Sequence, residues 1–84
     1  MVQAEELYRR IKQEKPFVPL RVYLNDGRTC DVVHRELAIV QKSYLIIGVP
    51  APDQRAPIYD YTEVVRLADI TRIEELPASA ALAS

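Results

Sequence analysis

The feature that most constrains the fold is a hairpin sequence over residues 19–33, in which apolar and polar side chains alternate on both sides of an Asp-Gly dipeptide. Alternation with a period of two is typical of strands with one buried face. A two-residue loop would pair Val22 with Asp31 and place a carboxylate on the buried face. A three-residue Asn-Asp-Gly loop pairs Val22 with Cys30 instead, because a slip of one residue exchanges the two faces of a strand. We therefore predict the longer loop, with Gly27 in the left-handed conformation and a bulge beside it.

Length and composition indicate a single domain. The chain has 84 residues, 49% of them hydrophobic, which is enough for one core and too short for two. We expect one domain over residues 1–76, formed by a helix at 3–15 and a barrel at 17–76. Residues 77–84 are small and carry no apolar pattern, so they are expected to form a disordered tail.

The remaining elements follow from periodicity. Apolar residues at helical spacing precede Pro16, which is expected to end the N-terminal helix. The hairpin strands, at about 19–24 and 28–34, are followed by strands at 37–41, 44–49, 58–67 and 71–75, with a 3₁₀ turn at 67–70. This order predicts an α+β, mostly β fold: an N-terminal helix followed by a small, strongly bent antiparallel sheet or barrel of five or six strands.

The strands at 37–41 and 44–49 are apolar on both faces. Such strands are either central or covered on their outer face. The helix is the natural local cover, and a second copy of the chain is the alternative. A small core and an apolar outer face together predict a homo-oligomer.

Several kinds of chemistry are disfavoured by composition. One cysteine and one histidine exclude an internal disulfide and a zinc site within one chain, and two glycines leave no phosphate-binding loop. The net charge of −1 is spread along the chain, which disfavours generic DNA binding. His34 with Glu36 or Asp31 is the one candidate acid–base pair, and it has no nucleophile beside it. We therefore expect no enzyme activity, no cofactor and no metal.

A possible interaction surface is formed by polar and aromatic residues outside the core pattern. His34 and Arg35 belong to a polar corner, and two tyrosines spaced two residues apart could stack on bases. The simpler interpretation makes the histidine a structural turn residue and the tyrosines core or rim residues. The full candidate set is His34, Arg35, Lys42, Tyr44, Tyr59 and Tyr61.

The expected location is the cytoplasm. The N-terminus lacks the basic and then apolar pattern of a signal peptide. The longest apolar run, at 44–49, is far too short to cross a bilayer as a helix. The sequence thus predicts no membrane association.

Two resemblances follow from these residues. The predicted order of elements, with a 3₁₀ turn before the last strand, resembles the Sm-like and SH3-like barrels, although the Sm strand motifs are absent. The segments at 15–28 and 70–74, with Pro-Phe-x-Pro, Asp-Gly-Arg and Ile-Thr-x-Ile-Glu motifs, resemble a group of small bacterial proteins. That resemblance implies a single domain over about residues 5–76 and no particular chemistry.

Two functions remain. The first is a non-enzymatic interaction module that binds itself or a protein partner. The alternative is an Sm-like RNA-binding ring, in which loop residues such as His34, Lys42 and Arg55 would contact RNA.

Overall fold

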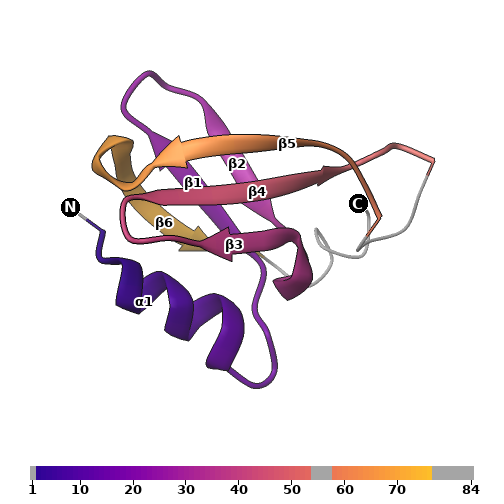
Figure 1. Ribbon diagram of the computed structural model, residues 1–84, viewed down its shortest axis with the longest axis horizontal. Helices are drawn as coiled ribbons and strands as arrows, with labels where there is room; N and C mark the ends of the chain where they lie inside the picture. Colours follow the sequence, from indigo (N-terminus) through magenta and orange to yellow (C-terminus); the bar gives the residue numbers. More distant parts are fainter. Residues whose placement is uncertain (1, 54–57, 77–84) are drawn as a thin grey trace.

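The computed structural model describes residues 2–53 and 58–76. Within these residues the chain forms an N-terminal helix and six strands in two antiparallel sheets (Figure 1). This confirms the α+β, mostly β class. The predicted tail at 77–84 and Arg55 lie outside the described residues.

Each sheet has three strands, in the orders β2-β1-β6 and β3-β4-β5. The helix begins as α1 (Ala4–Tyr8) and continues as one π-helical segment, η1 (Arg9–Gln13). The other elements are β1 (Leu20–Leu24), β2 (Thr29–Val32), η2 (Arg35–Leu37), β3 (Ala38–Val40), β4 (Tyr44–Pro50), β5 (Tyr59–Arg66), η3 (Leu67–Asp69) and β6 (Ile70–Glu75).

The helix and the second strand are shorter than predicted. Glu14 is already extended, so the helix ends before Lys15, the residue that Pro16 keeps out of the helical region. β2 ends at Val32 because the chain turns into the 3₁₀ helix η2, which occupies the predicted polar corner.

The hairpin has the predicted register. Val22 lies opposite Cys30, with Leu20 opposite Val32. The Gly27 N–H donates to the Leu24 carbonyl at 3.1 Å, and Gly27 has a φ of 91°. The three-residue loop with a left-handed glycine is therefore confirmed, and alternation was sufficient to identify the buried face.

The predicted 3₁₀ turn before the last strand is present as η3, and it carries the chain from one sheet to the other. It joins the end of β5 to the start of β6, and β6 then pairs with β1. Leu67 and Ile70 are both buried at this crossing, which anchors it in the core. The two sheets thus face one another across a shared interior.

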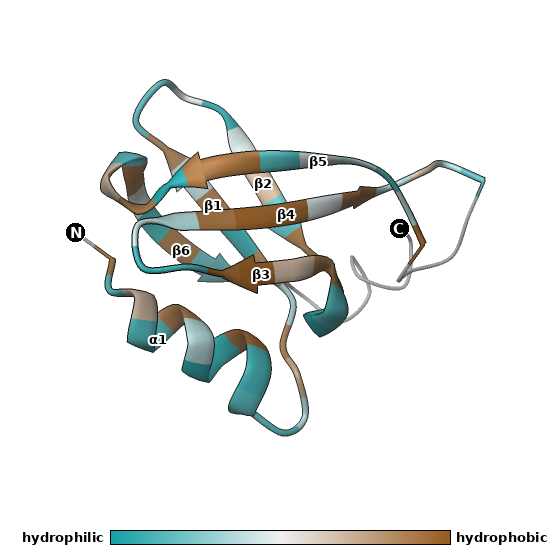
Figure 2. Ribbon diagram, in the orientation of Figure 1, coloured by the Kyte–Doolittle hydropathy of each residue, from teal (hydrophilic) through white to brown (hydrophobic). Residues whose placement is uncertain are grey.

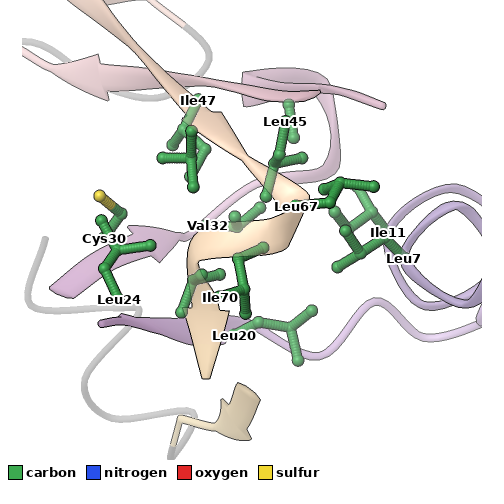
Figure 3. Close-up of a cluster of buried hydrophobic side chains, with 13 residues drawn as sticks. Leu7, Ile11, Leu20, Leu24, Cys30, Val32, Leu45, Ile47, Leu67 and Ile70 are labelled. Carbon is green, nitrogen blue, oxygen red and sulfur yellow. The ribbon is translucent and has the colours of Figure 1, made fainter. Parts of the chain in front are cut away.

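The helix closes one end of this interior. Leu7 and Ile11 are fully buried and lie beside Leu67 in the core cluster (Figure 3). The sequence suggested that the helix covers the outer face of β3 and β4, but it leaves this sheet open: Ile39 of β3 and Val64 of the adjoining β5 are 57% and 62% exposed. Figure 2 shows hydrophobic residues along β3, β4 and part of β5.

The helices in the described part of the chain are all too short to span a membrane.

Candidate functional site

The outer face of the β2-β1-β6 sheet is polar and internally paired. The Arg21 guanidinium donates to both carboxylate oxygens of Asp31, at 2.8 and 3.0 Å, and this ion pair raises the pKa of Arg21. On the same face Tyr23 donates to Glu74, and the guanidinium of Arg72 lies 4.1 Å from the centre of the Tyr23 ring. These groups are satisfied within the chain, as expected of a face that contacts water.

The outer face of the β3-β4-β5 sheet is different. Ile39, Ile46 and Val64 lie opposite one another in the two ladders and form one row across all three strands, here called the apolar row. Ile39 and Val64 are more than half exposed, whereas the polar sheet offers no comparable aliphatic row. This aliphatic row is the candidate interaction surface of the described chain.

Two of the predicted interaction residues extend the apolar row. Tyr44 lies opposite Arg66 on the same face of the sheet and is 41% exposed. Tyr59 lies near the other end of β4, against Gly48, and is 55% exposed. The core-or-rim expectation concerned Tyr59 and Tyr61, and Tyr61 is likewise 52% exposed, so neither of them is part of the core.

The predicted polar corner has a structural role. The His34 Nδ1 accepts a hydrogen bond from the Glu36 N–H at 3.1 Å and caps η2. Arg35 donates to the carbonyls of Lys12 and Glu14, at 3.2 and 2.7 Å, and so satisfies the C-terminal end of the helix. Both side chains therefore spend hydrogen-bonding atoms on contacts within the chain, and those atoms are not free to bind a ligand.

Lys42 lies away from the polar corner. It is exposed in the turn between β3 and β4 and lines a shallow groove of about 610 Å³ together with Tyr8 and Arg9 of the helix. The predicted residues therefore do not converge on one site.

Sequence reasoning missed a groove between β2 and β5, here called the β2–β5 groove. It has a volume of about 540 Å³ and is lined by residues of both sheets. The Cys30 thiol donates to the Glu63 carboxylate across it at 2.7 Å. The available signal was Glu63 itself, because a charged residue interrupts the inward-facing pattern of β5. A register shift between Val49 and Pro50 occurs at this end of β5.

The thiol of Cys30 is buried, as predicted, and is poorly suited to nucleophilic chemistry. Burial and the neighbouring Glu63 carboxylate raise its pKa to about 12, so the thiolate is scarce near neutral pH.

Among residues 2–53 and 58–76, no cluster of three or more His, Cys, Asp or Glu side chains is placed to hold a metal ion.

Comparisons of the chain with protein-family models, with curated proteins and with solved structures found no match.

Proposed function

We propose that this chain is a non-enzymatic interaction module that associates with a second copy of itself through the apolar row. The observation that supports this proposal is the contrast between the two sheets. One outer face carries paired charges, while the other carries Ile39, Ile46 and Val64 in register. A pair of like faces buries both apolar rows at once, which is the self-complementarity that a two-fold dimer requires.

The position of the two tyrosines favours a second copy over an unrelated partner. Tyr44 and Tyr59 flank the row toward opposite ends of β4. When two such faces stack about a two-fold axis that runs across the strands near Ile46, Tyr44 of each copy faces Tyr59 of the other. Tyrosine is enriched at interfaces because it combines a large apolar ring with a hydroxyl that can stay wet.

The size of the face sets the expected strength. The seven residues of β4 extend about 23 Å at ~3.3 Å per residue, and three strands span about 14 Å. The resulting face of roughly 320 Å² is smaller than the ~800 Å² per partner of a stable interface. The dimer is therefore expected to be weak and to depend on concentration.

The test is sedimentation velocity across a range of protein concentrations. The wild-type chain should shift from monomer to dimer, and Val64→Glu should weaken the dimer by more than tenfold because it places a charge in the apolar row. Thr29→Glu is the matched control, since Thr29 is an exposed β-branched residue on the other sheet.

Val64→Thr keeps the shape of the side chain and should also weaken the dimer. It provides the test if the glutamate variant does not fold. A wild-type chain that stays monomeric near millimolar concentration, or equal effects of Val64→Glu and Thr29→Glu, would overturn the proposal.

The alternative is an Sm-like RNA-binding ring. It has less support because His34 and Arg35, which it would use for RNA, make their hydrogen bonds within the chain. Native mass spectrometry of the purified protein distinguishes the two functions. A ring of several subunits that loses mass on ribonuclease treatment would favour the alternative, whereas a monomer–dimer mixture favours the module.

A further inference from the structure

The β2–β5 groove is a second surface, separate from the apolar row. It is lined by the inner face of β4 and β5 on one side and by β2 on the other. In Figure 3, Cys30 lies at the edge of the core cluster, where the packed interior gives way to this groove. Its volume of about 540 Å³ falls within the ~300–1,000 Å³ range of ligand sites.

Two of the strands that line the groove, β2 and β5, are edge strands. β2 is the outermost strand of its sheet, and β5 is the outermost strand of the other. Each edge presents backbone N–H and C=O groups that no neighbouring strand of the described chain uses. Such an edge accepts an extended peptide by adding one more strand to the sheet.

The lining of the groove is acidic and contains no Lys or Arg side chain within the described residues. Two carboxylates line it, those of Asp31 and Glu63. Asp31 is neutralised by the bidentate contact with Arg21. The hydrogen-bond partner of Glu63 among the described side chains is the thiol of Cys30, which is neutral near pH 7.

Arg28 is the cationic side chain next to the groove residue Thr29, and it pairs with Asp26. The main cause of its raised pKa is Asp26, whose carboxylate accepts from the Arg28 Nε at 2.7 Å. Arg28 is thus already paired, and among the described residues Glu63 is the carboxylate of the groove that has no salt-bridge partner.

We propose that the β2–β5 groove binds an extended segment of a partner protein, which adds to the edge of β5 and places a lysine or arginine side chain on Glu63. The charge of the groove selects the basic residue, and the free strand edges select the extended backbone.

The spacing of the lining residues defines the segment further. Tyr61 and Glu63 are two residues apart on the inner face of β5, with Val49 opposite Tyr61. In an added strand, residues two apart point to the same face. The bound segment should therefore carry its basic residue two positions from an aliphatic or aromatic one.

The test uses a displayed library of random eight-residue peptides, selected against the wild-type chain and in parallel against Glu63→Gln. Peptides selected on the wild type should contain a basic residue two positions from an apolar one. A synthetic peptide of the selected sequence should lose at least tenfold in affinity on Glu63→Gln, and also when its basic residue is replaced by glutamine.

Glu36→Gln is the matched control, because it removes the same charge from an exposed carboxylate on η2 and should leave affinity unchanged. In ¹⁵N-labelled protein, the amide signals of Asp31, Tyr61 and Glu63 should move on titration. Cys30→Ser, which keeps a donor to Glu63, should still bind and serves as the second variant if Glu63→Gln is unstable.

The proposal is overturned if the selection yields no binding peptides, if the selected peptides carry no basic residue, or if they bind Glu63→Gln equally well. Signals that move on the apolar row instead of the groove would also overturn it. Ile39 belongs to the apolar row but lies on β3, two strands away from β5, so Ile39→Glu should retain peptide binding even where it abolishes self-association.

Discussion

The Cys30 thiol lies 2.7 Å from the Glu63 carboxylate and links β2 to β5 across the opening between the sheets. Burial, followed by this carboxylate, raises the pKa of Cys30 from its usual 9.0 to about 12. The folded state therefore holds the proton more tightly than the unfolded state does.

The stability that depends on this proton should be present below about pH 9 and should fall as the pH rises from 9 toward 12. The measurement is urea unfolding at pH 8 and at pH 10.5, compared with Cys30→Val. The variant lacks the thiol, so it should lose less stability over this interval. Tyrosine and lysine titrations are common to both proteins and cancel in the comparison. Equal losses in both would show that the thiol proton is not coupled to folding.

Gly27→Val should destabilise the chain through the backbone alone. Gly27 has a φ of 91°, and a Cβ added there would meet no atom within 4 Å. The cost of forcing a β-branched residue into this region is about 1–2 kcal/mol in the free energy of unfolding. Gly27→Asn is the control, because asparagine tolerates positive φ better and should cost less. Equal stability of the valine variant and the wild type would contradict the left-handed turn.

Gly48→Ala should destabilise the chain through crowding. An added Cβ would lie 3.1 Å from Leu37 Cδ2 and 3.2 Å from Tyr59 Cβ. The Tyr59 Cβ is fixed to the backbone of β5, so it cannot move without shifting the ladder. Overpacking of this kind costs about 1–3 kcal/mol.

A double-mutant cycle with Leu37→Val checks the cause of the Gly48→Ala loss. Valine lacks the Cδ2 atom, so the two substitutions together should cost less than the sum of their separate effects. Additive losses would indicate that crowding against Leu37 is not the reason.

Arg35→Ala should lower the free energy of unfolding, because Arg35 has a structural role. Its guanidinium donates to the Lys12 and Glu14 carbonyls at the end of the helix. Loss of hydrogen bonds from a charged donor costs about 1.5–3 kcal/mol. Arg9→Ala is the control, because Arg9 is exposed and pairs with Glu14 at 3.2 Å, a contact worth at most about 1 kcal/mol. Urea unfolding of both variants decides the matter, and equal losses would contradict the structural role of Arg35.

The local features of this fold could be predicted from the sequence. The register that pairs Val22 with Cys30 follows from alternation and from the Asn-Asp-Gly turn, because both act over a few neighbouring residues. The same is true of the helix that precedes Pro16 and of the 3₁₀ turn at Leu67–Asp69. In each case the signal lies within the element that it specifies.

Tertiary structure alone decided the features that join distant parts of the chain. β4 is apolar on both faces, so its sequence could not say whether Ile46 or Ile47 would be buried, and the packing of β4 against the other sheet chose Ile47. The sequence placed Arg35 in a polar corner on the surface, yet its guanidinium contacts the end of a helix more than twenty residues away. Cys30 and Glu63 are 33 residues apart, and no local pattern pairs them. Periodicity determines which side chains share a face, whereas the way the sheets and the helix fill one core determines which face is covered and which is left to bind.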